Sequence, residues 1–387
     1  MKVCNKIVTI EQARSLFPHI KSGKIYFNHA ATGPFSNDVI SSVNKYLLQR
    51  SETDIDNFSQ LMNAVNNAKN YLSHMINCKT DRIAFIDNTS NGMNILANGI
   101  KWHNGDSILL NDIEFPANVY PFLNLQKEGV KVEFVKSHNG IVSADDLINS
   151  IKPNTRLISI SFVQFLSGYR VDLKKIGNVC RERGIIFSVD AIQGLGAFTL
   201  DVEKYKIDFI SCGTAKWLLG MQGLAFIYVD ENFQQTLQPK YVGWLSVEDA
   251  WNILDFNLKL KSSADAFQCG TINSLGVFGL LPSLKLFADF GYKSVEERIL
   301  DNSTHFIERL QEIGIHPILE SCERENLSGI ISFKHEKASH ILDELKKKEI
   351  YCSVREGMVR LSPHFYNTKE EIDKVVDEIS CILGVPS

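Results

Sequence analysis

Short apolar runs alternate with amphipathic stretches through the first two thirds of the chain. The runs are four to six residues long and rich in Val, Ile, Leu or Phe, which is typical of strands buried on both faces. Seven strands are predicted, at residues 82–86, 107–110, 131–135, 156–161, 185–189, 207–211 and 224–229. Helical periodicity between them predicts helices at residues 90–100, 117–128, 144–150 and 173–183. This alternation predicts an α/β fold, with a mostly parallel seven-stranded sheet flanked by helices.

The last third of the chain has a different pattern. Charged amphipathic stretches predict helices at residues 294–312, 336–348 and 369–382, and short apolar runs predict strands at 330–333, 351–354 and 358–361. This α+β pattern predicts a second, smaller domain. We place the large domain at residues 21–264 and build the small domain from residues 1–20 and 265–387.

Composition narrows the class of protein. The chain has 387 residues, 44% of them hydrophobic and 22% charged, which are ordinary globular values. A net charge of −4 implies no broad basic face, so a nucleic acid is not expected as partner. The most apolar stretch, residues 217–229, is too short to span a bilayer, so no membrane partner is expected. Residues 1–13 lack the apolar core of a signal peptide.

The cysteines bear on metal binding and location. The chain has eight, and none forms a C-x-x-C pair, so no metal site is predicted. Scattered thiols in a chain of this length favour a reducing, cytoplasmic location.

Two charged side chains follow neighbouring predicted strands. Asp190 directly follows the strand at 185–189, and Lys216 follows the strand at 207–211. Parallel sheets bind ligands beyond the carboxyl ends of their strands. Pyridoxal 5′-phosphate (PLP) needs both groups: a lysine for the Schiff base and an acid that keeps its ring nitrogen protonated. Taken singly, Asp190 is better explained as a helix cap and Lys216 as a surface lysine, but their combination after neighbouring strands favours a cofactor site.

The sequence around these residues carries a resemblance. Ser-Val-Asp-Ala-Ile-Gln at 188–193 and Lys-Trp-Leu-Leu-Gly at 216–220 resemble the class V aminotransferases, which are PLP-dependent enzymes of fold type I. That group includes cysteine desulfurases, selenocysteine lyases and isopenicillin N epimerase-like proteins. The resemblance extends from residues 25–31 to residues 362–368, nearly the whole chain. It implies fold type I and PLP as cofactor.

The resemblance also implies individual roles around the ring. Lys216 would be the Schiff-base lysine, Asp190 the partner of the pyridinium nitrogen, and Gln193 the hydrogen-bond partner of the ring hydroxyl. Phe115 would stack on the ring where many relatives carry a histidine, although a core phenylalanine is an equal alternative. Gln164 follows the strand at 156–161, where relatives often place an amide against the ring oxygen.

Hydroxyl and amide residues are placed to bind the phosphate. Asn-Thr-Ser-Asn-Gly at 88–92 lies between a predicted strand and a predicted helix, where backbone N–H groups can bind an anion or be capped by the same side chains. The residues implied here are Thr89, Ser90, Asn91 and Thr214. Thr271, in Cys-Gly-Thr-Ile-Asn at 269–273, resembles the segment that reaches the phosphate of a neighbouring subunit. The resemblance therefore implies a homodimer with shared sites.

An amino-acid substrate needs a group that binds its carboxylate. Arg360 matches the family's carboxylate-binding arginine, and Arg355 is a second candidate. The alternative for Arg360 is a surface arginine on an edge strand. His29 is expected to face the substrate end of the pocket, with a purely structural histidine as the alternative.

The cysteine positions bear on the reaction. A cysteine desulfurase needs a nucleophilic cysteine on a mobile loop shortly before the carboxylate arginine, and residues 351–360 leave no room for one. Cys352 reads as a packed hydrophobic residue. We expect aminotransferase-like chemistry on a small amino acid, with a C–S lyase lacking a catalytic cysteine as the first alternative. A non-catalytic scaffold is the second, and a dinucleotide oxidoreductase ranks low because no G-x-G-x-x-G follows the first strand.

Overall fold

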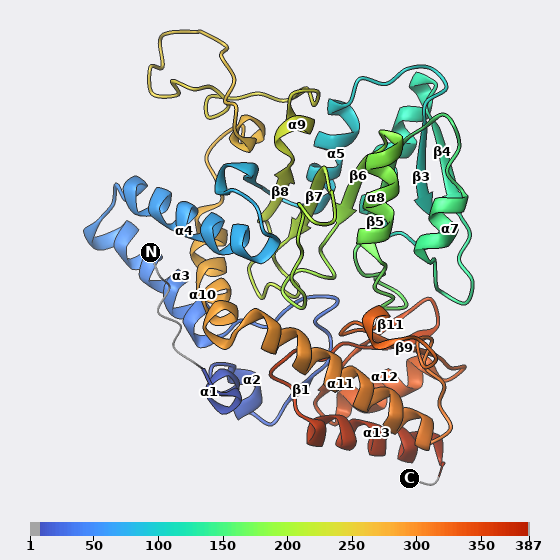
Figure 1. Ribbon diagram of the computed structural model, residues 1–387. Coiled ribbons are helices and arrows are strands. Elements are labelled where there is room, and N and C mark those ends of the chain that lie inside the picture. Colours follow the sequence, from blue (N-terminus) through green and yellow to red (C-terminus); the bar gives the residue numbers. More distant parts are fainter. Residues whose placement is uncertain (1–7, 386–387) are drawn as a thin grey trace.

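A seven-stranded sheet forms the centre of the molecule (Figure 1). The computed structural model describes residues 8–385, so part of the segment 1–13 examined above lies outside the described residues. The strands, in the spatial order β2-β8-β7-β6-β5-β3-β4, are β2 (Ile83–Ile86), β8 (Ala225–Val229), β7 (Phe209–Gly213), β6 (Ile186–Asp190), β5 (Thr155–Ser161), β3 (Ser107–Asn111) and β4 (Lys131–Val135). Strand β8 pairs antiparallel with β2 and β7, and the other neighbours pair parallel. The predicted sheet is confirmed.

Helices cover both faces of this sheet, which explains why strands such as β3 and β8 are buried along their whole length. The helices between the strands are α5 (Thr89–Gly99), α6 (Tyr120–Leu123), α7 (Ala144–Asn149) and α8 (Leu173–Arg183), and α9 (Glu231–Gln234) follows β8, the last of these strands in the sequence. Helix α8 begins after Asp172, whose carboxylate accepts the Lys175 N–H at 3.0 Å, and it ends at Gly184, where φ is 65°.

The continuous helix predicted at 117–128 is wrong. The segment consists of two 3-10 turns, Pro116–Asn118 and Asn124–Glu128, on either side of the four-residue α6. Pro121 lies in the first turn of α6 and has no N–H to continue hydrogen bonding from the preceding turn.

Three long helices form a layer at one end of the sheet (Figure 1). They are α3 (Asn37–Leu48), which continues into a π-helical turn at Gln49–Thr53, α4 (Phe58–Ile76) and α10 (Ser274–Phe290). Helix α10 packs against both α3 and α4. The short helices α1 (Ile10–Ser15) and α2 (Pro18–Lys21) precede them.

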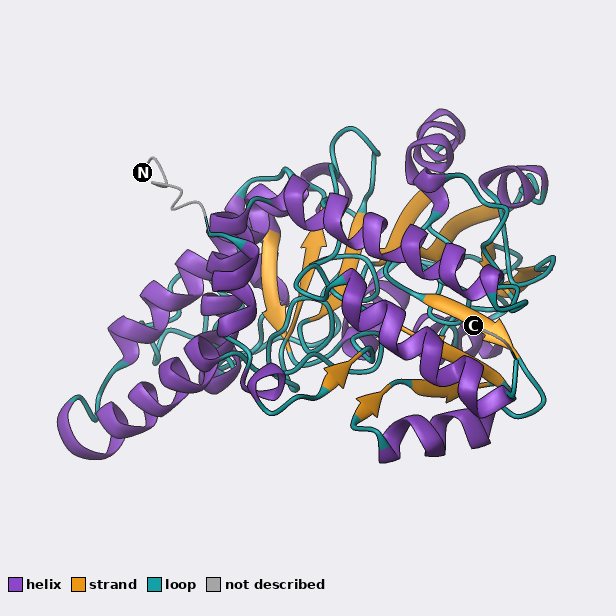
Figure 2. Ribbon diagram, turned by 90° about the horizontal axis from the view of Figure 1, so that it is seen from below, coloured by secondary structure: helices purple, strands orange, loops and turns teal. Residues whose placement is uncertain are grey.

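The C-terminal third forms a smaller α+β layer (Figure 2). Its antiparallel sheet has the order β11-β12-β9, from β11 (Ser353–Arg355), β12 (Met358–Leu361) and β9 (Ile331–Lys334). The helices are α11 (Tyr292–Glu312), α12 (Ala338–Lys347) and α13 (Lys369–Leu383). Strand β1 (Ile25–Tyr26) pairs parallel with β10 (Ile350–Tyr351), so chain near the N-terminus joins this layer. The boundary at 264/265 stays a prediction.

Among residues 8–385, no single helix is long and apolar enough to cross a membrane. Only α10 and α11 together meet those criteria, and the break between them bends by 85°.

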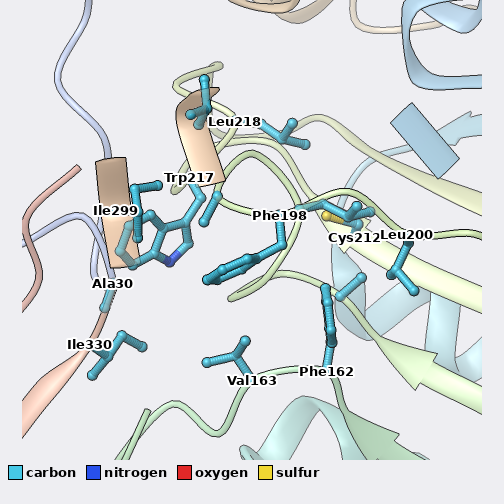
Figure 3. Packing of buried hydrophobic residues seen from close by; sticks show 14 of the residues in the cluster. Ala30, Phe162, Val163, Phe198, Leu200, Cys212, Trp217, Leu218, Ile299 and Ile330 are labelled. Carbon is cyan, nitrogen blue, oxygen red and sulfur yellow. The ribbon is translucent and has the colours of Figure 1, made fainter. Parts of the chain in front are cut away.

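Trp217 is the largest fully buried side chain and lies where the two parts of the molecule meet. Figure 3 shows its ring among Ala30, Ile299 and Ile330. Gly329 lies against the ring so closely that a Cβ there would be 2.3 Å from it. This packing fixes the backbone next to Lys216.

Candidate active site

Asp190 and Lys216 share a buried region at the carboxyl ends of β6 and β7. Asp190 ends β6 and is 1% exposed, and its Oδ1 accepts the Ile192 N–H at 3.0 Å. Burial raises the pKa of Asp190 to about 7, and the charge of Glu114 acts in the same direction. Burial lowers the pKa of Lys216 to about 8, although the charge of Asp190 opposes this shift. The two predicted catalytic residues are thus brought together, with pKa values moved towards neutrality.

The predicted stacking residue lies beside this lysine. Lys216 Nζ is 5.6 Å from the centroid of the Phe115 ring. Phe115 is 43% exposed and touches Phe165 edge-on, with centroids 5.3 Å apart. The structure therefore places Phe115 at the surface of the site, so the alternative of a core phenylalanine does not apply.

The predicted phosphate loop lies at the N-terminus of α5. Asn88 caps this helix, its Oδ1 accepting the Asn91 N–H at 2.9 Å. Thr89 is buried with its hydroxyl unpartnered among the described residues, whereas Ser90 and Asn91 are exposed. Because α5 presents backbone N–H groups and positive dipole at this end, an anion is favoured here.

Two close contacts place α5 against β7. Gly92 packs on Ser211 so tightly that a Cβ at Gly92 would be 2.1 Å from the Ser211 hydroxyl oxygen. A Cβ at Gly213 would be 3.1 Å from Thr89 Oγ1. The helix N-terminus is therefore fixed next to the strand that leads to Lys216.

Gln193 connects the segment of Lys216 to the N-terminal chain. Its Nε2 donates to the Ala30 carbonyl at 2.9 Å, and its Oε1 accepts from Trp217 Nε1 at 2.9 Å. His364 Nε2 contacts the Trp217 carbonyl at 2.9 Å. Gln193 thus orders the chain around the lysine, and its predicted bond to the ring hydroxyl stays a prediction.

Arg360 is a buried cation that contacts no acid among the described residues. It lies on β12, is 2% exposed, and donates to the Phe165 carbonyl at 2.7 Å and to Ser353 Oγ at 3.3 Å. Burial lowers the pKa of Arg360 to about 10, and neighbouring Arg355 adds to this shift. Arg360 lies near the lysine, because the Phe165 whose carbonyl it binds touches Phe115, and the Phe115 ring lies beside Lys216. Both arginines also lower the pKa of Lys216. Arg355 itself is exposed. A buried guanidinium without an acidic partner in the described part of the chain is suited to binding the carboxylate of a ligand.

Two predictions need correction. His29 is completely buried, with Nδ1 at 2.8 Å from the Ser362 carbonyl and Nε2 at 2.6 Å from the Tyr366 hydroxyl, so both ring nitrogens are engaged in the fold. Burial also keeps the pKa of His29 well below its usual range. The Thr214 hydroxyl donates to the Met221 and Leu224 carbonyls at 2.8 and 3.0 Å, which leaves it no hydrogen for a phosphate.

Glu114 is the buried acid that the sequence did not single out. It stands immediately before Phe115, and its carboxylate accepts a hydrogen bond from Gln164 Nε2 at 2.9 Å. Gln164 Oε1 is buried and unpartnered among the described residues. In a sequence, an acidic residue after a strand usually indicates a turn, so the place of Glu114 in the site becomes visible only from its contacts in the structure.

Thr271 lies at the surface of the molecule. It is exposed and borders a cavity of about 570 Å³, which is also lined by Asn91, Gly223, Tyr241 and Asn273. Its predicted role in a neighbouring subunit stays a prediction. Among residues 8–385, no group of three His, Cys, Asp or Glu side chains is arranged to hold a metal.

Comparison with known proteins identifies the family. The family model described as Aminotransferase class-V matches residues 25–375. The chain is 26% identical to the uncharacterized aminotransferase YcbU of Bacillus subtilis, covering 96% of this chain and 97% of YcbU. It is 28% identical to a probable cysteine desulfurase of Methanothermobacter thermautotrophicus, covering 93% and 95%. A C-DES mutant with glycine covalently linked to the PLP cofactor superposes with a TM-score of 0.87, at 22% identity, covering 95% of this chain and 98% of that one.

The protein belongs to the class V aminotransferases, an enzyme family that uses PLP. The residues of this chain fit the cofactor. A lysine lies beside an exposed aromatic ring and close to a buried acid, and at the N-terminus of a nearby helix a buried threonine hydroxyl has no partner among the described residues. Lys216 would carry PLP, Asp190 would hold its ring nitrogen, and the start of α5 would hold its phosphate.

Proposed function

We propose that this protein is a PLP-dependent aminotransferase that acts at Cα of a small amino acid. One observation carries the proposal: a lysine with a pKa of about 8 lies in a buried site with an acid and an arginine that contacts no acid in the described part of the chain. Bound PLP supplies an electron sink for the negative charge left at Cα.

Lys216 supplies the base in this proposal. Because burial lowers its pKa to about 8, an appreciable fraction of the amine is neutral near pH 7 and can accept a proton. Asp190 would hold the protonated ring nitrogen of bound PLP, because its carboxylate is buried and accepts only the Ile192 N–H among the described residues, which leaves it free to bind a cation. Arg360 orients the amino acid by binding its carboxylate.

The small sheet argues against a persulfide-forming reaction. Strands β11 and β12 pair antiparallel, with Ser353 opposite Arg360 and Arg355 opposite Met358. The tight turn at residues 356–357 joins the two strands, which leaves no long loop before Arg360. Cys352 is buried, and burial raises its pKa to about 12. Its thiol is therefore a poor nucleophile at neutral pH.

A C–S lyase without a catalytic cysteine is the second candidate. C-DES is described as a cystine C–S lyase in its complex with cysteine persulfide, and its fold matches this chain with a TM-score of 0.85. In such a reaction Lys216 would remove the same Cα proton, and a sulfur substituent would leave from Cβ. The early steps are shared, so products decide between the two.

We also propose a homodimer and a cytoplasmic location. Thr271 is exposed beside a cavity, and large apolar side chains such as Trp251, Leu254 and Phe256 are exposed on the loop that projects at the top of Figure 1. A second subunit would cover such residues. The described cysteines are free thiols, as is usual in a reducing compartment.

The test is a panel of amino acids offered to the protein loaded with PLP. A keto acid formed together with the amino form of the cofactor supports transamination. Pyruvate and ammonia, together with sulfide from cysteine or cysteine persulfide from cystine, support the lyase instead. The Lys216→Ala variant is the control and should give neither set of products. A wild-type protein that binds PLP but converts no amino acid would overturn both candidates.

A further inference from the structure

Glu114 is a buried carboxylate at the carboxyl end of the central sheet. It follows β3 by three residues, is 7% exposed, and directly precedes Phe115, whose ring lies beside Lys216. A buried acid is costly unless its charge is compensated by hydrogen bonds or by a cation. The groups that contact this carboxylate therefore indicate its role.

Within residues 8–385, five hydrogen bonds reach this carboxylate, all from neutral groups. Oε1 accepts from Asn111 Nδ2 at 2.7 Å, from the Ser161 N–H at 2.9 Å and from Gln164 Nε2 at 2.9 Å. Oε2 accepts from Asn118 Nδ2 at 3.1 Å and from the Ser161 hydroxyl. Each neighbour delivers a hydrogen, so the arrangement suits an ionised carboxylate whose charge no contacting cation neutralises.

These bonds hold the side chains that surround the cofactor region. Asn111 and Asn118 lie on either side of Phe115 in the sequence, so Glu114 fastens the loop that carries this ring. The bond to Gln164 fixes which way that amide points: its nitrogen faces Glu114, and its oxygen is left unpartnered among the described residues.

The uncompensated charge acts on the neighbouring acid. Glu114 raises the pKa of Asp190, while Lys216 opposes it. Arg360 and Arg355 lower the pKa of Lys216, whereas Cys212 raises it. A second negative charge next to Asp190 stabilises any cation bound there, by Coulomb attraction in a region that water does not screen.

We propose that Glu114 is a positioning residue of the active site, whose buried charge strengthens the hold of Asp190 on the ring proton of PLP. Its hydrogen bonds fix Phe115 and Gln164 around that ring. The inference rests on the proposed use of PLP at Lys216. It predicts that charge and geometry at position 114 have separable effects.

The experiment is a pH titration of the visible absorption of the PLP-loaded protein. Glu114→Gln keeps the size but removes the charge, and its titration midpoint should fall by about one pH unit, because a nearby negative charge favours the protonated cofactor. Glu114→Asp keeps the charge and should retain the wild-type midpoint. Asn111→Ala removes one hydrogen bond to Glu114, and also the bond that Asn111 Oδ1 accepts from the Ile113 N–H, but it leaves the charge, so it is the matched control with an unchanged midpoint.

Thermal unfolding gives the second readout. All three variants should have a lower Tm, since each disturbs hydrogen bonds to a buried group. The inference is overturned if the titration midpoint of Glu114→Gln equals that of the wild type. It is also overturned if Glu114→Asp shifts the midpoint as far as Glu114→Gln does. If Glu114→Gln does not fold, Gln164→Lys brings a cation to the same carboxylate and should lower the midpoint likewise. A wild type that takes up no PLP overturns the proposed function itself, before any variant is compared.

Discussion

At the residue scale, burial moves two pKa values towards each other. The pKa of Lys216 falls to about 8 and that of Asp190 rises to about 7, because both side chains lose water in the same region. An isolated lysine at its ordinary pKa would hold its proton at neutral pH and could neither attack a carbonyl nor accept a proton. The site thus prepares the amine for its chemistry before any cofactor arrives.

This shift predicts how uptake of PLP depends on pH. Above about pH 8 the Lys216 amine is neutral, and below it the fraction of neutral amine falls about tenfold per pH unit. The rate at which the visible band of bound cofactor develops should therefore rise from pH 6 to about pH 8 and then level off. Stopped-flow absorption would measure it. Lys216→Ala should develop no band, and a pH-independent rate would contradict the assigned shift.

Arg360 should determine affinity for the amino acid. Replacing it by alanine removes the buried guanidinium, and charged hydrogen bonds of this kind contribute about 1.5–3 kcal/mol each. We expect amino-acid binding to weaken about 10- to 100-fold while PLP remains bound, measured by titrating the cofactor spectrum. Arg355→Ala should have the smaller effect, because that side chain is exposed. Unaltered binding in Arg360→Ala would remove it from the site.

The sequence revealed those residues that belong to a recognisable combination. Lys216 and Asp190 could be predicted because an acid and a lysine that follow neighbouring strands together match what PLP needs, although neither is distinctive alone. His29 and Thr214 could not be judged, since their roles depend on partners far away in the sequence or on backbone carbonyls. Glu114 was missed for the same reason: its main partners include Ser161 and Gln164, which lie on another strand end.

At the element scale, buried strands were the most predictable part. Strands β4 and β12 and helix α8 lie exactly where the pattern placed them, because each has a clear apolar period and a definite end. The strand predicted at 351–354 instead divides at Cys352, since β10 pairs with β1 whereas β11 pairs with β12. Such a division depends on chain from the other end of the sequence, so no local pattern contains it.

The contact between α5 and β7 predicts the effect of one methyl group. Gly92→Ala would place a Cβ 2.1 Å from the Ser211 hydroxyl oxygen, so the helix must move away from the strand. We expect a loss of about 1–3 kcal/mol in the free energy of unfolding, as for other overpacked sites, and weaker PLP binding because the helix N-terminus moves. Urea unfolding and cofactor titration would measure the two effects.

Asn98→Ala is the matched control on the same helix. Asn98 is half-buried and bonds only within α5, to the carbonyl and side chain of Asn94, and alanine favours the helix. Its stability and PLP affinity should stay near the wild-type values. Equal behaviour of the two variants would show that the close approach of α5 to β7 does not position the phosphate site.

At the scale of the whole molecule, the site lies where distant parts of the chain meet. Trp217 packs against Ala30 from the N-terminal chain and against Ile299 and Ile330 from the C-terminal third (Figure 3). Gln193 accepts a hydrogen bond from its ring nitrogen, and His364 contacts its carbonyl. Side chains from both parts of the molecule therefore hold the residue next to Lys216 in place.

A shared site between two subunits predicts complementation. Thr271→Asp would bring a negative charge to the phosphate of the neighbouring subunit and should weaken PLP binding there by Coulomb repulsion. Lys216→Ala abolishes the site of its own subunit. Each variant alone should lack normal PLP binding. In a hybrid dimer, the subunit carrying Thr271→Asp retains Lys216 and receives an unaltered Thr271 from its partner, so one complete site is restored.

The measurement is the visible cofactor band after the two variants are unfolded together and refolded. Random pairing makes about half of the dimers hybrid, so about a quarter of all sites should regain the band, with the sedimentation coefficient of a dimer. If Thr271 instead acts within its own chain, each subunit of the hybrid carries one defect and no site is restored. Recovery of the band therefore distinguishes a shared site from two independent ones, and a monomeric protein would contradict the proposed assembly.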